Sequence, residues 1–246
     1  MTERPSDVAC VSERTVDVSL GGRLRVCQPR RGYRFNFEAV ALTHRAASLQ
    51  PQTVIDVGAG SGVIGCGVAV LCPQSRVLLI ERDPTLAGCA RATIEENDLS
   101  ARVELRVLDV REVAADTRSA DVVVMNPPYY RPGHSRRSPN PSRAGARQQL
   151  HGEIETLCAA AVARVVDGGA LVVSYPASVA VELMRAASES GFAEQRVQWI
   201  HDSPHAEASA LLLTARRGRA LRLRVDAPLV LRHSDGRLRA QDELWP

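Results

Sequence analysis

One run in the first third of the chain, Val54 to Gly62, constrains the fold more than any other segment. Val54 to Val57 has the β-branched character of a buried strand, and the turn Gly58-Ala59-Gly60-Ser61-Gly62 leads directly into a helical pattern. Further β-branched runs alternate with helical patterns downstream, and no internal repeat is visible. This alternation predicts an α/β protein with a mainly parallel sheet.

The predicted elements follow one another closely along the chain. Strands are expected at Val54–Val57, Val77–Ile80, Val103–Leu108, Asp121–Met125 and Ala170–Tyr175, and helices at Val63–Leu71, Thr85–Glu96, Gln148–Val166 and Val179–Ser190. Pro84 suits a first helical turn, and Asn97 and Gly168-Gly169 are predicted to end their helices. The segment Arg131 to Arg147, rich in Pro, Gly, Ser and Arg, is predicted as an exposed loop.

Two antiparallel pairs are predicted at the two ends of this pattern. Val16–Leu20 and Leu24–Cys27 flank Gly21-Gly22, which is the signal of a hairpin with a two-residue turn. Near the C-terminus, Glu194–Ile200 is expected to pair with Ala208–Ala215. The sheet is therefore expected to end in a hairpin.

Acidic residues close two of the predicted strands beside the glycine turn. The glycines are spaced GxGxG, unlike the GxGxxG of dinucleotide-binding proteins, and give the clearance that a cofactor without phosphates needs. Glu81 is placed to accept hydrogen bonds from two ribose hydroxyls, and Asp109 to accept one from an adenine amino group. Such turns and acids are common in doubly wound sheets, but together at one edge they indicate an adenosine site.

The tetrapeptide Asn126-Pro127-Pro128-Tyr129 follows the fourth predicted strand. Two prolines fix φ and remove backbone donors, so the Pro127 carbonyl and the Asn126 side-chain oxygen are expected to act as two fixed acceptors. Two acceptors suit an NH₂ group and direct its lone pair at an electrophile. Tyr129 is predicted to stack on a planar substrate. The pattern indicates methylation of an exocyclic amine or an amide, with no general base required; a proline-rich strand exit without a role is the alternative.

Composition excludes several other chemistries. All 31 residues counted as lysine plus arginine are arginine, which excludes Schiff-base lysines and the lysine of phosphate-loop and kinase sites. The six cysteines form no CxxC pair, so we expect packed thiols and no metal. The net charge of +3 is too small to indicate nucleic-acid binding by itself. With no apolar leader and no membrane-length apolar stretch, a cytoplasmic protein without membrane contact is expected.

These motifs together resemble a known family. DVGAGSG, Glu81, Asp109 and NPPY are similar to the Rossmann-like, seven-strand methyltransferases that use S-adenosylmethionine. With GYRFNFEAVALTHRAA (Gly32 to Ala47) and APLVLRHSDGRLRAQ near the C-terminus, the chain resembles the tRNA1(Val) (adenine-N6)-methyltransferase family, from about Arg14 to Leu244. The resemblance implies methylation of the adenosine 3′ of the anticodon in a valine tRNA.

The resemblance also implies a division of the chain and a set of site residues. One methyltransferase domain is expected over 1–246, with an N-terminal hairpin and cofactor-covering segment at 1–48, a catalytic core at 49–216 and a C-terminal extension at 217–246. The catalytic residues would be Asn126, Pro127, Pro128 and Tyr129. The cofactor residues would be Arg34, Phe35, Asn36, Asp56, Gly58, Ala59, Gly60, Gly62, Glu81, Arg82, Asp109, Val110 and Asn126.

RNA contacts are predicted from arginines next to the NPPY tetrapeptide. Arg131, Arg136, Arg137, Arg143 and Arg147 lie in a stretch without acids, and arginine pairs with phosphates and stacks on exposed bases. The clusters at Arg23–Arg31 and Arg216–Arg224 are interpreted as solvated charge. The family commonly has Arg-His-Glu where this chain has Arg147-Gln148-Gln149, and aspartate where it has Glu38; the first difference bears on RNA contacts.

Several alternatives stay open at this point. The same tetrapeptide serves glutamine-N5 methylation of release factors, although those enzymes usually carry a helical N-terminal domain where this chain begins with a hairpin. DNA adenine or rRNA guanine-N2 methylation is a further alternative, and an inactive RNA-binding module of the same fold is the non-enzymatic one. A monomer with a tRNA substrate is expected.

Overall fold

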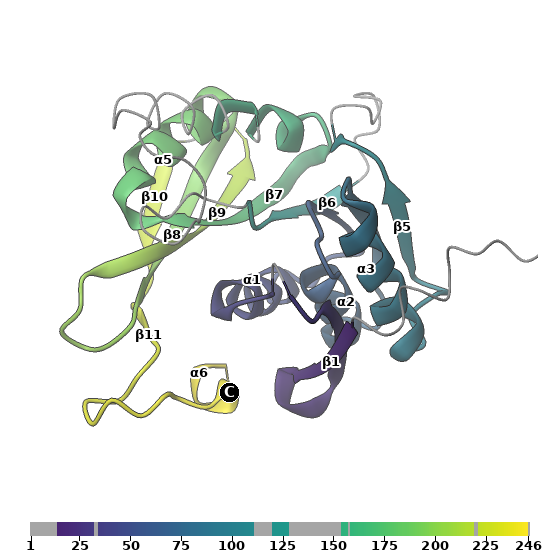
Figure 1. The fold of residues 1–246 in the computed structure, drawn as a ribbon. Helices are drawn as coiled ribbons and strands as arrows, with labels where there is room; N and C mark the ends of the chain where they lie inside the picture. The colour runs from purple at the N-terminus through teal and green to yellow at the C-terminus, as the bar shows by residue number, and fades with distance from the viewer. Residues whose placement is uncertain are drawn as a thin grey trace, which may run out of the picture. The chain divides into compact units, whose positions relative to one another are not determined.

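The computed structural model describes residues 14–31, 34–110, 120–127, 154–156, 158–218 and 221–245. The chain divides into two compact units, Met1–Val113 and Ala114–Pro246. The fold is mixed α/β, with a mostly parallel main sheet and a separate antiparallel hairpin near the N-terminus (Figure 1). The predicted fold class is thereby confirmed, and the prediction of a single domain stays a prediction.

Three parallel strands carry the glycine turn in the first unit. They are β3 (Thr53–Val57), β4 (Arg76–Glu81) and β5 (Val103–Val107), with β4 in the middle. Helix α2 (Val63–Leu71) connects β3 to β4, and α3 (Pro84–Glu96) connects β4 to β5. Both helices lie within one residue of their predicted bounds, and the carboxyl ends of the three strands meet at one edge.

Two glycines inside α2 allow this helix to lie close to its neighbours. A Cβ atom on Gly65 would lie 2.3 Å from Leu79 Cδ2 of β4, and one on Gly67 would lie 2.6 Å from Thr43 Cγ2. Thr43 belongs to α1 (Phe37–Ala47). Helix α2 therefore packs on β4 with one face and on α1 with another, at distances that a larger residue would not permit.

We expect Gly65→Ala to lower the free energy of unfolding by about 1–3 kcal/mol, because the added methyl group overpacks a filled space. Gly88→Ala, in α3, is the matched control: its Cβ would meet only the guanidinium end of Arg14, at 2.8 Å. That end is able to move, and alanine gains about 1 kcal/mol of helix propensity over glycine. Urea denaturation of both variants measures the difference, and equal losses would contradict the close packing of α2.

The N-terminal hairpin pairs β1 (Arg14–Ser19) with β2 (Leu24–Pro29), as predicted. Its connection is longer than the predicted two-residue turn, because Leu20–Gly22 form a 3₁₀ turn and Arg23 follows it. The side chain of Leu20 is buried, and its Cδ1 would lie 3.3 Å from a Cβ on Gly67 of α2. The predicted strand included Leu20, whereas β1 ends at Ser19. Burial of the Leu20 side chain against α2 explains why the turn begins one residue earlier than predicted.

The hairpin is attached to the C-terminal half of α3. The Cys27 amide donates to Thr93 Oγ1 at 3.0 Å, and the Arg25 amide donates to Asn97 Oδ1 at 2.9 Å. The side-chain amide of Asn97 returns a hydrogen bond to the Arg25 carbonyl at 2.7 Å. Asn97 caps α3 as predicted, and it also fixes β2 to the end of that helix.

The second unit carries a further set of hydrogen-bonded strands. Their order is β6 (Ala120–Met125), β7 (Val165–Pro176), β9 (Ala208–Arg217), β8 (Phe192–His201) and β10 (Arg222–Val225), and β11 (Leu229–Val230) also pairs with β8. β6 and β7 are parallel, whereas β9 is antiparallel to both β7 and β8. The predicted C-terminal antiparallel pair is confirmed; β10 and β11, which run parallel to β8, were not predicted.

The predicted helix at Gln148–Val166 is wrong at its C-terminal end. Its described part is helical at 154–156 and 158–162, whereas Val165 and Val166 already belong to β7. Gly168-Gly169 lies inside this strand and does not end a helix. Ala120 of β6 pairs with Val165 and Val122 pairs with Ala170, so the residues between form a bulge, where Gly168 has a φ of +79°.

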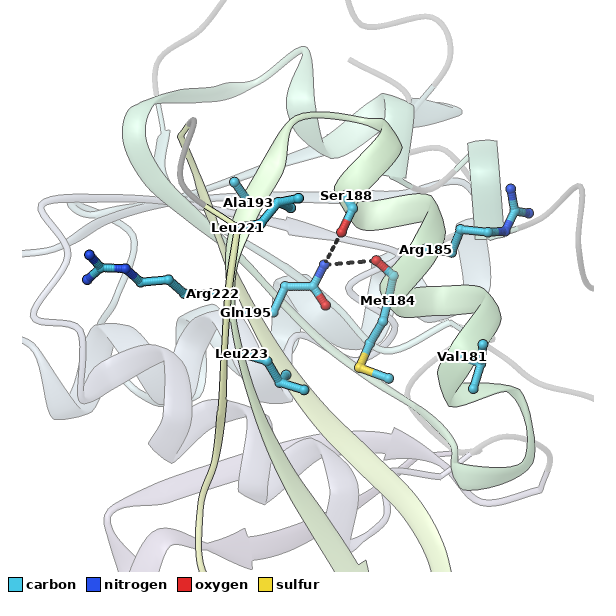
Figure 2. A pocket seen from close by; sticks show the side chains of 9 residues that line it. All are labelled: Val181, Met184, Arg185, Ser188, Ala193, Gln195, Leu221, Arg222 and Leu223. Atoms are coloured by element: carbon cyan, nitrogen blue, oxygen red, sulfur yellow. Dashed lines mark hydrogen bonds between the residues drawn. The ribbon is translucent and has the colours of Figure 1, made fainter.

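Helix α5 (Ala180–Glu189) follows the 3₁₀ turn η3 (Ala177–Val179) and ends before Gly191, near its predicted bounds. The Gln195 side chain of β8 ties it to the sheet, donating to the Met184 carbonyl at 2.8 Å and to Ser188 Oγ at 2.7 Å (Figure 2). A short helix, α6 (Gln241–Leu244), lies near the C-terminus. Within the described ranges, no helix has the length and apolarity needed to cross a membrane.

Candidate cofactor site

The turn after β3 is held by hydrogen bonds to the end of β4. Gly58, Gly60 and Gly62 all have positive φ, at 71°, 58° and 80°. The Gly58 and Ala59 amides both donate to the Ile80 carbonyl, at 2.9 and 3.0 Å, and the Gly62 amide donates to the Ala59 carbonyl at 2.8 Å. The Gly60 amide donates to Glu81 Oε2 at 2.8 Å.

Four backbone amides of the glycine turn therefore donate hydrogen bonds to acceptors within the protein. A turn that binds phosphate presents its amides to the ligand, because each oxygen needs donors. Here those of Gly58, Ala59, Gly60 and Gly62 already have acceptors. A Cβ on Gly58 would meet no atom within 4 Å, so there is open space beside the turn. Clearance without phosphate donors fits a cofactor such as S-adenosylmethionine, which carries no phosphate.

Glu81 lies at the end of β4 with 6 % of its surface exposed. Its Oε1 accepts from the Asp83 amide at 2.8 Å, while Oε2 accepts from Gly60. An ionised carboxylate has about four acceptor positions, so each oxygen is able to accept one further hydrogen bond. The carboxylate is held rigidly at the strand end, in the place where it was predicted to bind ribose hydroxyls.

Asp109 follows β5 and lies beside Arg82. The Arg82 Nη1 and Asp109 Oδ2 atoms are 3.8 Å apart, and the Leu108 amide donates to the Glu81 carbonyl at 3.2 Å. Arg82 is largely exposed, and Val110 is half-buried. The first unit thus brings together the glycine turn, Glu81 and Asp109 at the ends of its three strands.

Asp56 lies beneath the glycine turn with none of its surface exposed. Its Oδ2 accepts from the Gly65 amide at 2.8 Å, which fixes the first turn of α2, while Oδ1 has no partner among the described residues. Burial raises the pKa of Asp56 to about 7; the Gly65 hydrogen bond opposes this shift and the Glu81 charge adds to it. The buried Asp56 carboxyl group therefore stabilises the start of α2, directly after the glycine turn.

We expect Asp56 to make the protein less stable as the pH rises. The folded protein keeps the Asp56 proton up to about pH 7, whereas the unfolded chain loses it near pH 4, so the free energy of unfolding falls between these values. Asp56→Asn removes the ionisation and keeps an acceptor for Gly65. Urea denaturation at pH 5 and pH 8 should therefore show a smaller loss of stability for the variant. An equal loss would mean that Asp56 does not titrate in this range.

Two residues that shape this region, Asp83 and Gly65, were not among the predicted site residues. Asp83 caps α3 by accepting from the Thr85 and Leu86 amides, at 2.8 and 3.1 Å, and also donates its own amide to Glu81. An aspartate directly before Pro84 is a recognisable helix start. Gly65 admits the Asp56 carboxylate to the start of α2, and a glycine inside a helical pattern was the available signal.

The segment Arg34–Asn36 also lies in the first unit, between the hairpin and α1. Asn36 caps α1 by accepting from the Ala39 amide at 3.3 Å. The Arg34 side chain contacts the hairpin, where its Nη1 donates to Thr15 Oγ1 at 2.9 Å. The structure thus gives Arg34 a partner within the protein, and the predicted cofactor contact of this segment stays a prediction.

Asn126 and Pro127 directly follow β6 in the second unit. The strand is buried up to Met125, and both residues are half-buried, so they stand where the chain leaves the core. Pro128, Tyr129 and the five predicted RNA-binding residues, Arg131, Arg136, Arg137, Arg143 and Arg147, lie outside the described residues, as do Gln148 and Gln149.

The two other arginine clusters bind groups of their own chain. Arg25 pairs with Glu96 at 2.6 Å, and Arg217 pairs with Asp167 at 3.0 Å. Arg217 also donates to the Val162 and Val165 carbonyls, at 2.9 and 3.1 Å. Arg25 and Arg217 thus have partners within the protein, where the sequence interpretation had been solvated charge.

Two other features of the structure contain no predicted site residue. A hollow of about 480 Å³ lies between α5 and β10 and is largely apolar, lined by Val181, Met184, Leu221 and Leu223 among others (Figure 2). The five cysteines of the described part are buried and form no disulfide, and burial raises the pKa of the Cys158 thiol to about 12. Packed thiols are confirmed for these five, and within the same residues no group of His, Cys, Asp and Glu is placed to hold a metal.

A family model for the methyltransferase small domain matches residues 39–177. The chain belongs to this family. The match covers most of α1, the glycine turn, Glu81, Asp109 and the NPPY tetrapeptide. The protein is therefore a methyltransferase, as the motifs predicted.

Curated relatives confirm the predicted family resemblance. A protein of Porphyromonas gingivalis named tRNA1(Val) (adenine(37)-N6)-methyltransferase is 29% identical over 68% of this chain and 66% of its own length. A second protein of that name, from Yersinia pseudotuberculosis, is 27% identical over 86% of this chain and 83% of its own length. The match spans slightly less than two thirds of the Porphyromonas relative.

Solved structures share the fold and include complexes with the cofactor. A predicted O-methyltransferase from Agrobacterium tumefaciens is 27% identical, with a TM-score of 0.67 over 84% of this chain and 94% of that chain. A 16S rRNA N2 methyltransferase from T. thermophilus, 18% identical, has a TM-score of 0.60 over 83% of this chain and 50% of its own, and was solved with AdoMet and guanosine. S-adenosylmethionine is the cofactor of this methyltransferase. It carries no phosphate, which agrees with a glycine turn whose four amides already have acceptors within the protein.

Proposed function

We propose that the protein transfers the methyl group of S-adenosylmethionine to the N6 amine of an adenosine in tRNA. The observation that carries this proposal is the NPPY tetrapeptide, whose Asn126 and Pro127 emerge half-exposed at the end of a buried strand. Two relatives bearing the name of this activity support it. By the same resemblance, the target is the adenosine 3′ of the anticodon in a valine tRNA.

Asn126 and Pro127 orient the target amine in this proposal. The amine donates one hydrogen to Asn126 Oδ1 and the other to the Pro127 carbonyl, which directs the nitrogen lone pair toward the cofactor. When bound, S-adenosylmethionine supplies the electrophilic methyl group. Tyr129 stacks on the adenine after the base has left its stack, at about 1–3 kcal/mol per stacked base. The N–C bond would form as the cofactor's S–CH₃ bond breaks, with S-adenosylhomocysteine as the leaving group, and the proton lost from the amine would pass to water.

Incubation of the protein with labelled S-adenosylmethionine and unmodified total tRNA tests this proposal. Label recovered as N6-methyladenosine supports it, and mapping of the labelled tRNA by mass spectrometry identifies the nucleotide. Label in N2-methylguanosine, or transfer only to a release-factor glutamine when that protein is supplied, would instead support one of the other amine substrates. Cofactor binding without transfer to any of these substrates would indicate an inactive binding module.

We expect Arg136→Ala combined with Arg137→Ala to raise the KM for tRNA and to weaken its dependence on salt. Two lost phosphate contacts should reduce the slope of log affinity against log salt by about 1.4–1.8. Arg222→Ala combined with Arg224→Ala is the matched control, because these arginines are exposed on β10 and interpreted as solvated. Steady-state kinetics at several salt concentrations measures both. An unchanged KM in the first variant would exclude RNA contact by these two residues.

A further inference from the structure

The N-terminal hairpin holds the backbone of the segment Arg34–Asn36 through hydrogen bonds. The Phe35 amide donates to Gln28 Oε1 of β2 at 2.7 Å. The Arg34 guanidinium donates to Thr15 Oγ1 of β1 at 2.9 Å and to the Pro29 carbonyl at 3.2 Å. Both strands of the hairpin therefore contact this segment, directly before α1 begins at Phe37.

Gln28 is the centre of this network. Its Nε2 donates to the Asp17 carboxylate, and the same Asp17 oxygen accepts from Arg34. An amide has one donor end and one acceptor end, so binding of its NH₂ group by Asp17 turns Oε1 toward the Phe35 amide. Gln28 is only 2 % exposed. Because a buried amide without partners is costly, this orientation is strongly preferred.

The hairpin is itself fixed to the helix that begins beside Glu81. Thr93 and Asn97 attach β2 to the C-terminal half of α3, and the N-cap of α3, Asp83, donates its amide to Glu81. A connected set of hydrogen bonds thus joins the predicted ribose carboxylate, α3, the hairpin and Arg34–Asn36. All of its members lie in the first unit.

We propose that Gln28 and Asp17 are positioning residues for S-adenosylmethionine, holding Arg34–Asn36 in the conformation that covers the methionine end of the cofactor. The proposal rests on the assignment of this segment to the cofactor and not on the identity of the methyl acceptor. Gln28 fixes the segment through the Phe35 amide, and Asp17 acts through Gln28 and Arg34. Their influence should therefore be confined to the amino-acid half of the cofactor.

Binding measurements without RNA test this proposal, with S-adenosylmethionine and 5′-methylthioadenosine as probes. The second probe lacks the amino-acid part of the cofactor. Gln28→Ala should raise the Kd of S-adenosylmethionine about threefold to tenfold, which is the loss expected from one hydrogen bond, and should leave that of methylthioadenosine unchanged. Isothermal titration calorimetry gives both constants, and their ratio is the readout that general destabilisation would not move.

Thr93→Val is the matched control, because it removes another buried hydrogen bond of the hairpin, to Cys27, without touching Arg34–Asn36. It should lower the melting temperature and leave the ratio of the two Kd values at the wild-type level. Asp17→Ala, at a partly exposed position, should change the ratio in the same direction as Gln28→Ala and serves if that variant does not fold. An unchanged ratio in Gln28→Ala, or in Asp17→Ala where only that variant folds, would overturn the proposal. Since no RNA is present, failure of tRNA methylation leaves this result unaffected.

Discussion

Asn126→Ala is expected to reduce methyl transfer to a small residual rate while leaving the affinity for S-adenosylmethionine nearly unchanged. Asn126 supplies one of two proposed acceptors for the target amine, and alanine leaves the nitrogen lone pair without direction. We expect kcat to fall by about 10²–10³, as happens when one positioning hydrogen-bond partner of a reacting group is removed. Single-turnover transfer to tRNA measures the chemical step, and calorimetry measures cofactor affinity.

Asn126→Asp provides the control for this experiment. Aspartate keeps an oxygen acceptor at the same position, so part of the transfer activity should return, whereas a purely structural role would not distinguish the two variants. Because Asn126 is half-buried, we expect both variants to fold, and circular dichroism checks this. Loss of cofactor binding in Asn126→Ala, with transfer reduced only in proportion, would mean that Asn126, which the resemblance also assigns to the cofactor, does not orient the amine.

The second large effect is expected for Glu81→Gln. Glutamine has about the same size but no charge, and one end of its amide no longer accepts hydrogen bonds. We expect the Kd of S-adenosylmethionine to rise about tenfold to a hundredfold, since hydrogen bonds to charged groups contribute about 1.5–3 kcal/mol. Glu104→Gln is the matched control, because Glu104 is exposed on β5 and pairs with Arg106.

We expect Glu81→Gln also to lower the stability of the protein. Because Glu81 also accepts from the Gly60 and Asp83 amides, the variant should be less stable without the cofactor as well. Thermal denaturation with and without S-adenosylmethionine separates the two contributions. If the cofactor stabilises Glu81→Gln as much as it stabilises the wild-type protein, the ribose assignment is wrong.

The parts of the fold that sequence predicts well are those with local signals. Helices α2 and α3 begin after Gly62 and at Pro84 and end before Pro73 and at Asn97, and each of these residues acts on its immediate neighbours. The hairpin turn was not predicted in detail, because it depends on Leu20 packing near Gly67, which is far away in the chain. Strand β10 was missed because all of its residues are exposed, so no buried face produces a pattern.

The candidate site divides in the same way. Strand-end acids and a glycine turn are visible in sequence because parallel strands place their carboxyl ends at one edge, and this led to Glu81 and Asp109. The link between Gln28 and Phe35 depends on the antiparallel register that sets Asp17 near Gln28 and on the return of the chain to the hairpin. A glutamine within a predicted strand indicates neither this register nor the return of the chain to the hairpin.

The hydrogen bonding of the glycine turn has a consequence for competition inside a cell, where ATP shares its adenosine with S-adenosylmethionine and is far more abundant. A bound triphosphate would meet a turn whose Gly58, Ala59, Gly60 and Gly62 amides are already taken. Its charge would also lie near the carboxylates of Glu81 and Asp109 rather than near a lysine. Binding an anion without donors is costly, so we expect a turn of this kind to disfavour ATP where it would accept S-adenosylmethionine.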